Sequence, residues 1–271
     1  MATKKEKPRV SMIISTYNRV DALSLCLQSI ACQSLLPDEL VIGDDGSRND
    51  TLQMIQSFQK HFPIPIVHVW QEDKGFRLAM ARNKSVAQCK YEYIIEIDGD
   101  LILDRRFVED HVYFACEGYF IKGGRVNLTE ELTKKLCSSL RLPDLNFLSK
   151  GLKRRINAFH CLSLSTYLST RYKKNKIVGL GCNMSFWKKD YIAINGYDEF
   201  FEGWGGEDWD FACRMLNSGV KRFYLKFSGI VFHLWHQDFH MQNKDKNFEY
   251  YYEKKGAKAS RCDKGIDQYL L

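Results

Sequence analysis

The chain has 271 residues, 45% of them hydrophobic, which is enough for one large α/β domain or two small ones and excludes a disordered protein. The net charge of +7 is local, because eleven of the 40 Lys and Arg lie between Glu131 and Lys176 against two acids, so we expect no nucleic-acid partner. No run reaches the roughly 18 apolar residues of a membrane span, and the nine cysteines form no CxxC pair. We therefore expect a cytoplasmic protein with reduced thiols.

The first hundred residues alternate short apolar runs with helical patterns. Strands are predicted at residues 10–15, 39–43, 66–70 and from 93 onward, and helices at 20–32, from 49 or 50, and at 77–88. This alternation predicts an α/β fold with a mostly parallel, Rossmann-like central sheet flanked by helices. The absence of GxGxxG after the first strand argues against a nicotinamide dinucleotide site, and GxxxxGK[ST] is absent too.

Polar clusters follow all four predicted strands, at residues 16–19, 44–47, 71–75 and 98–100. Ligands of parallel sheets bind at the carboxyl ends of the strands, so these clusters predict one site. At strand spacing, Asp98 and Asp100 project to the same side, where they could hold Mg²⁺ or Mn²⁺, and Gly99 leaves room for a ligand. A polar turn after a core strand is the alternative for this DGD sequence taken alone.

Four motifs in this half are STYNR (15–19), GDDGS (43–47), DKGFRLAMARN (73–83) and IDGD (97–100). In this order and spacing they resemble glycosyltransferase family 2, the nucleotide-sugar enzymes with the GT-A fold. The resemblance implies that a UDP-sugar donor is bound by Thr16, Tyr17, Asn18, Asp45, Arg77, Arg82 and Asp98. Asp45 would pair with the base, Arg82 would lie near the diphosphate with Arg77 as the weaker candidate, and Asp100 would ligate the metal. A solvated helix face is the alternative for Arg82.

The basic segment, residues 131–176, mixes its eleven cations with Leu, Phe and Tyr in drifting helical phases. One interpretation is a solvated helical hairpin. The other is a cationic amphipathic surface that touches anionic lipid, or a lipid-linked acceptor, at the inner face of the plasma membrane.

The second half contains GWGGEDWDFACRMLNSG at residues 203–219, after a predicted strand or hairpin (177–186) and a short helix that stops at Asn195 and Gly196. Three glycines precede Glu207, Asp208 and Asp210, which begin a helix. Simple capping of that helix could explain one acid. The segment resembles the β-1,4-galactosyltransferases and bacterial chondroitin-type polymerases, and this implies Asp208 as the general base, Glu207 as an acceptor ligand and Trp204 as a sugar-stacking wall.

Two strand-like runs, at 221–227 and 230–232, lead into VFHLWHQD, where His233 and His236 are three residues apart. A bare HxxH can bind metal or be two unrelated histidines. The resemblance implies that a histidine here completes the metal site of Asp100, with His236 the firmer choice, His233 second, and Asp98 as a further candidate. Residues 238–271 carry no predicted chemistry and could close over the acceptor groove.

Together these features predict one GT-A domain with a donor half (8–125), a basic helical insertion (126–176), an acceptor half (177–240) and a tail (241–271). The predicted activity is inverting, metal-dependent transfer of a hexose or N-acetylhexosamine from a UDP-sugar to a saccharide or lipid-linked saccharide in surface polysaccharide or glycolipid synthesis. A nucleotidyltransferase and a non-catalytic carbohydrate-binding protein remain the alternatives.

Overall fold

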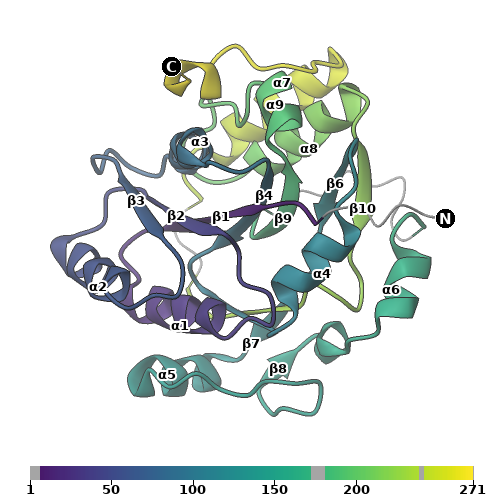
Figure 1. The fold of residues 1–271 in the computed structure, drawn as a ribbon. Helices are drawn as coiled ribbons and strands as arrows, with labels where there is room; N and C mark the ends of the chain where they lie inside the picture. Colours follow the sequence, from purple (N-terminus) through teal and green to yellow (C-terminus); the bar gives the residue numbers. More distant parts are fainter. Residues whose placement is uncertain (1–6, 172–180, 238–240, 271) are drawn as a thin grey trace.

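A central sheet with helices on both faces organises the structure (Figure 1). The computed structural model describes residues 7–171, 181–237 and 241–270. Seven strands form this sheet within the described residues: β1 (Val10–Thr16), β2 (Glu39–Asp44), β3 (Ile66–Trp70), β4 (Tyr93–Asp98), β6 (Tyr119–Lys122), β9 (Asn183–Trp187) and β10 (Lys221–Tyr224). Their order is β10-β6-β9-β4-β1-β2-β3, and only β9 runs antiparallel to its neighbours. The predicted mostly parallel α/β sheet is confirmed.

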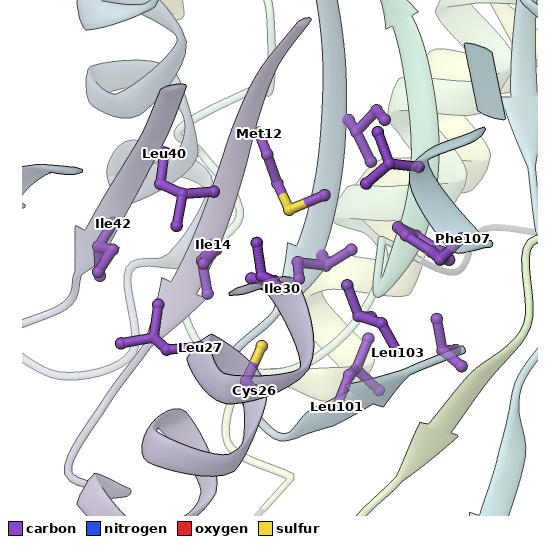
Figure 2. Close-up of a cluster of buried hydrophobic side chains, with 14 of the residues drawn as sticks. Met12, Ile14, Cys26, Leu27, Ile30, Leu40, Ile42, Leu101, Leu103 and Phe107 are labelled. Carbon is purple, nitrogen blue, oxygen red and sulfur yellow. The ribbon is translucent and has the colours of Figure 1, made fainter. Parts of the chain in front are cut away.

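Two hydrophobic cores lie on the two faces of the sheet. The helices α1 (Val20–Ala31), α2 (Asn49–Gln59) and α4 (Phe107–Phe114) cover one face, and α3 (Leu78–Gln88), α7 (Lys188–Ala193) and α8 (Glu207–Asn217) cover the other. Successive strand residues point to opposite faces, so Met12 and Ile14 pack with Leu27 and Ile30 of α1 (Figure 2), whereas Ile13 enters the opposite core.

A second, four-stranded sheet was not anticipated from the sequence. It consists of β5 (Leu101–Leu103), β7 (Val126–Leu128), β8 (Leu152–Lys153) and β11 (Val231–His233), in the order β5-β11-β7-β8. Its apolar residues pack with Ala22 and Leu25 of α1. This sheet brings the residues after β4 next to residues more than a hundred positions later.

The basic segment is built differently from a helical hairpin, so that interpretation is wrong. Its helices α5 (Glu130–Ser139) and α6 (Leu162–Leu168) are separated by β8, by the 3₁₀ turn η1 (Arg155–Ala158) and by irregular residues. Residues 172–176 of the segment, and 177–180 of the predicted strand or hairpin, lie outside the described residues.

The tail forms α9 (Lys244–Gly256) and the 3₁₀ turn η2 (Ile266–Tyr269). Phe248 and Tyr251 of α9 pack with Trp209 of α8.

The predicted stop after α7 is confirmed, because Asn195 and Gly196 have φ values of 67° and 70°. All nine cysteines are free and five are buried. Among the described residues, no helix is long and apolar enough to cross a membrane.

Candidate active site

Three alternate residues of β4 (Ile94, Glu96 and Asp98) point to the face of the sheet that α3 and α8 cover. Ile94 belongs to the core on that face, and Glu96 and Asp98 follow at the same strand spacing. Opposite them lies Arg82 of α3, whose side chain is only 1% exposed. The solvated-face interpretation of Arg82 is therefore wrong.

Arg82 is the centre of a buried ion-pair cluster. Its Nη1 donates to Asp208 Oδ1 at 2.8 Å, Nη2 lies 3.3 Å from Asp98 Oδ1, and Nε lies 3.3 Å from Glu96 Oε1. Tyr197 packs its ring 4.8 Å from the guanidinium and donates its hydroxyl to Glu96 Oε1 at 2.6 Å. One cation thus joins carboxylates from the β4 end and from the start of α8.

Burial dominates the electrostatics of this cluster. It raises the pKa of the Glu96 carboxyl to about 8, although Arg82 and the Tyr197 hydroxyl act in the opposite direction. Burial also raises the pKa of Asp98, again opposed by Arg82. The cluster therefore holds three acids near one buried cation: Glu96 is fully buried, whereas Asp98 and Asp208 are partly open to solvent.

Asp208 lies at the start of α8, where glycines shape the chain. Gly203, Gly205 and Gly206 have φ values of 78°, 91° and 93°, a region that side chains other than glycine rarely adopt. Besides Arg82, the amide of Gly181 donates to Asp208 Oδ2 at 2.6 Å.

All three acids lie in the first turn of α8, but none of them occupies the N-cap position. The N-cap residue is Gly206 and makes no side-chain cap hydrogen bond, while Asp210 pairs with Arg214 of the same helix at 2.6 Å. Burial raises the pKa of Glu207 to about 8, and its Oε2 has no hydrogen-bond partner among the described residues. Glu207 thus keeps an unused polar atom next to Asp208.

A candidate metal site lies beside this cluster, where Asp100, His233 and His236 bring one ligand atom each within 4.8 Å of one another. The second sheet creates this group, because β11 pairs with β5 in the register His233↔Leu101 and the Leu234 amide donates to the Asp100 carbonyl. The Nε2 atoms of both histidines lie 3.5 Å from Asp100 Oδ2. Asp98 faces Arg82 instead and is not part of this group, so its role as a ligand stays a prediction.

The three residues fit a divalent cation. Asp100 Oδ1 is buried without a hydrogen-bond partner among the described residues. Burial lowers the pKa of His233 to about 4, so its ring is neutral near pH 7 and offers a lone pair. Two imidazoles and one carboxylate match a first-row transition ion better than Mg²⁺, which prefers oxygen ligands.

The other predicted donor residues surround the ends of β1 and β2. Asp45 is 5% exposed and accepts from Gln71 Nε2 at 2.6 Å and from the Arg77 amide at 2.7 Å. Its own amide donates to the Thr16 carbonyl at 3.0 Å. Burial raises the pKa of the Asp45 carboxyl. Thr16, Asp45 and the Arg77 backbone therefore form one unit, while their contacts with a nucleotide stay predictions.

The two remaining donor candidates lie on the loop after β1. Tyr17 is 45% exposed and donates its hydroxyl to Asp73 at 2.9 Å. Asn18 adopts a left-handed φ of 49° and accepts from the Arg48 amide. The Arg77 guanidinium donates to the Glu72 carbonyl. These side chains tie the loops after β1, β2 and β3 together.

Gly99 has a packing role within the protein, and its role in the approach of a ligand stays a prediction. Its amide donates to the Ser15 carbonyl at 2.8 Å, and a Cβ there would lie 3.1 Å from that oxygen and 3.3 Å from Thr16 Cβ. The missing side chain lets the end of β4 approach the end of β1.

Trp204, the predicted sugar-stacking residue, is 43% exposed. We call residues 202–206 the glycine loop. Two hydrogen bonds join it to the tail: the Trp204 amide donates to the Gln242 carbonyl, and Asn247 Nδ2 donates to the Glu202 carbonyl. From the other side, the Gly203 amide donates to the Phe76 carbonyl at 2.9 Å. The tail thus supports this loop, a contact for which the sequence contained no signal.

Comparison with known proteins agrees with this arrangement. A model described as Glycosyl transferase family 2 matches residues 11–168, more than half of the chain. The chain belongs to glycosyl transferase family 2. A second model, described as the N-terminal domain of galactosyltransferase, matches residues 160–241, which contain the glycine loop and both histidines. The two resemblances inferred from the motifs are confirmed.

Similar family members include synthases of polysaccharides. The chain is 25% identical to the chondroitin synthase of Escherichia coli, with 78% of this chain and 32% of that protein covered. It is 26% identical to the validoxylamine A glucosyltransferase of Streptomyces hygroscopicus subsp. limoneus, with 79% and 49% covered. The chain therefore spans about a third to a half of the length of these relatives.

Solved structures share the fold. Staphylococcus aureus TarS 1–349 in complex with UDP-GlcNAc has a TM-score of 0.62 at 16% identity, covering 96% of this chain and 69% of that one. GalNAc-T7 with UDP, GalNAc and Mn²⁺ has a TM-score of 0.65 at 14% identity, covering 87% and 44%. These likenesses confirm the GT-A fold.

Sequence reasoning missed Glu96, Tyr197 and Gly181, which hold Arg82 and Asp208 in place. A signal existed for Glu96, since a lone acid inside the apolar run Tyr93–Asp98 must find a partner when it is buried. Gly181 and Tyr197 had no such signal.

Proposed function

We propose that this protein transfers a hexose or N-acetylhexosamine from a UDP-sugar to a saccharide acceptor, with inversion, in the synthesis of surface polysaccharide or glycolipid. The observation that carries the proposal is the Arg82 cluster, in which Asp98 from the predicted donor side and Asp208 from the predicted acceptor side contact one guanidinium. A transfer between two sugars needs the base of the acceptor side close to the donor, and this shared contact brings residues of the two predicted sides together.

In this proposal Asp208 removes the proton of the acceptor hydroxyl while that oxygen attacks the anomeric carbon. The bond from that carbon to the UDP oxygen breaks, and UDP leaves with the electron pair. A carboxylate offers about four lone-pair positions, and Arg82 and the Gly181 amide use two of them, so Asp208 can still accept from an acceptor hydroxyl. Glu207 and Trp204 would orient that acceptor.

Asp100, His233 and His236 would hold the divalent cation, for which we propose Mn²⁺ because of the two imidazole ligands. When bound, the ion offsets the negative charge of the departing diphosphate. Thr16, Tyr17, Asn18, Asp45 and Arg77 would bind the nucleotide.

Similar proteins support the choice of donor and product. Chondroitin synthase, hyaluronan synthase and poly-beta-1,6-N-acetyl-D-glucosamine synthase are named for polysaccharide synthesis, and two of the solved structures hold UDP with N-acetylhexosamines. The validoxylamine glucosyltransferase indicates that smaller acceptors also belong in the test.

The test is release of UDP from a panel of UDP-sugars with Mn²⁺ and saccharide acceptors. Replacing Asp208 with Asn should lower kcat by about 10²–10⁴-fold and leave UDP binding, measured by calorimetry, nearly unchanged. Glu202→Gln, in an exposed residue of the same loop, is the control and should keep full activity.

Loss of UDP binding together with turnover would contradict the base assignment, and full turnover in EDTA would contradict the metal role. Pyrophosphate release from UTP and a sugar 1-phosphate, assayed in parallel, would indicate a nucleotidyltransferase, and no turnover in either assay would indicate a binding protein.

A further inference from the structure

Exposed apolar side chains gather in one part of the molecule. Of the seventeen exposed large hydrophobic residues in the described part of the chain, seven lie between Leu140 and Tyr167. Leu148 is 78% exposed and Ile156 is 55% exposed. Single exposed apolar residues are ordinary, but this concentration is not, because contiguous apolar surface is costly in water.

Four of these side chains form what we call the apolar patch: Phe147, Leu148, Ile156 and Phe159. The rings of Phe147 and Phe159 meet edge to face with centroids 5.9 Å apart. Leu148 follows Phe147 directly, and Ile156 lies in η1 three residues before Phe159. Phe159 also packs on Phe227, with centroids 5.9 Å apart, which anchors the patch to the body of the protein.

Exposed cations lie close to the apolar patch in the sequence. Lys150, Lys153, Arg154 and Arg155 are exposed, and within the described part of the chain none of them has a carboxylate ion-pair partner. Between residues 140 and 171 there are six Lys or Arg and one acid, Asp144. The strand β8, which carries Lys153, is an edge strand of the second sheet and lies at the lower border of the molecule in Figure 1, with α8 and α9 at the upper side.

We propose that the apolar patch and these four cations bind the surface of an anionic lipid bilayer. Leu, Ile and Phe side chains enter the boundary between headgroups and acyl chains, while Lys and Arg contact anionic headgroups. A second copy of this chain fits less well, because pairing the patch with itself would bring like charges together. A saccharide fits less well too, because it offers nothing to cover exposed Leu148 and Ile156.

This inference goes beyond the proposed transfer reaction and does not depend on it, since bilayer binding needs neither donor nor metal. Its consequence is that α8, which lies on the opposite side of the molecule from β8 in Figure 1, would lie away from the lipid surface.

The experiment is co-sedimentation of the full chain with vesicles of phosphatidylcholine mixed with phosphatidylglycerol, and with vesicles of phosphatidylcholine alone. Each cation near an anionic surface contributes about five-fold to binding, and each new Glu adds repulsion, so Lys153→Glu, Arg154→Glu and Arg155→Glu together should weaken binding to the mixed vesicles by at least about a hundred-fold. Leu148→Ser with Ile156→Ser should weaken it by roughly ten-fold, because the lost burial is apolar. Both variants change exposed residues and should keep the wild-type melting temperature.

The matched control makes the same charge change elsewhere, at the exposed residues Lys60, Lys90 and Lys258. It should bind mixed vesicles far better than the patch variant. Equal loss in both triple variants would overturn the proposal, because net charge alone would then explain binding. The proposal is also overturned if wild type fails to prefer mixed vesicles, or if Leu148→Ser with Ile156→Ser only abolishes self-association in sedimentation velocity. UDP release with a soluble acceptor, measured in parallel, reports separately on the proposed function.

Discussion

The strand rim and the glycine loop place their acids by different means. In the strand rim, the carboxyl ends of β1, β2 and β4, backbone register sets each position: Ser15 pairs with Asp98 and Thr16 with Asp44. In the glycine loop, positive φ values and contacts from the tail and from Phe76 set the position of Asp208. The rim is thus positioned by regular strand pairing, whereas the loop depends on glycine conformations and on single hydrogen bonds to distant segments.

The two regions meet at Arg82, so removing its charge should have the largest effect. Arg82→Met leaves Glu96, Asp98 and Asp208 without their shared cation, and loss of one partner from a buried ion pair costs about 3–5 kcal/mol. Urea unfolding measures the loss of stability, and kcat should fall below detection where the variant is still folded.

Arg214→Met separates that effect from simple loss of a buried arginine. Arg214 is 2% exposed and pairs with Asp210 inside α8, so its removal should destabilise the protein without disconnecting the two regions. If folded Arg82→Met and folded Arg214→Met have the same kcat, then Arg82 has no role in joining the strand rim to the glycine loop.

The metal residues give the next largest effect. Asp100→Asn, His233→Ala and His236→Ala each remove one proposed ligand. Loss of an outer-shell partner lowers metal affinity by about 10–100-fold, so loss of a ligand should lower Mn²⁺ affinity by more than that. Calorimetric titration with Mn²⁺ measures this without any activity assay. His61→Ala, an exposed histidine outside the group, should bind as wild type. If the Mn²⁺ affinity of His233→Ala is unchanged, only Asp100 and His236 remain as proposed ligands.

Glycine substitutions test whether packing positions the glycine loop. Gly206→Ala adds strain at a φ of 93° and places a Cβ 2.6 Å from Phe201 Cε1, whereas Gly219→Ala meets the same strain at 91° with no atom within 4 Å. Strain of this kind costs on the order of 1–3 kcal/mol. Thermal unfolding should therefore show a larger loss for Gly206→Ala, and its kcat should fall while that of Gly219→Ala does not. Equal losses would argue that the loop tolerates displacement.

The smallest expected effect concerns pH. Burial raises the pKa of Glu207 to about 8, above its unfolded value of about 4.3, so the folded state holds a proton that the unfolded state has lost. This contribution to stability is complete below the unfolded pKa and is lost as the pH rises through about 8. In Glu207→Gln, the free energy of unfolding should fall by roughly 1 kcal/mol less, or by a larger margin, over the same rise in pH. Urea unfolding in the presence of EDTA measures this. Glu202→Gln should keep the wild-type slope, and an unchanged slope in Glu207→Gln would contradict the shift.

Much of the strand rim was predictable because its signals are local. The apolar runs, the helical spacing in 20–32 and the polar residues after each strand predicted β1 to β4, their helices and the edge where Asp45 and Asp98 lie. In the second sheet, β11 was predicted as the strand-like run 230–232, but β5, β7 and β8 were not predicted, since three or fewer residues per strand carry no periodic pattern. The partner of Arg82 was equally hidden, because Asp208 is 126 residues away in the chain.

The sequence by itself therefore determined the family, the α/β class and the identities of the acids, the arginine and the histidines, because motifs and periodicity are properties of neighbouring residues. Only the tertiary structure decided which of them meet. The pairing of β11 with β5 placed His233 beside Asp100, and the packing of α8 on the sheet placed Asp208 on Arg82. Both contacts depend on long-range backbone hydrogen bonds and apolar burial, whose partners a linear pattern does not specify.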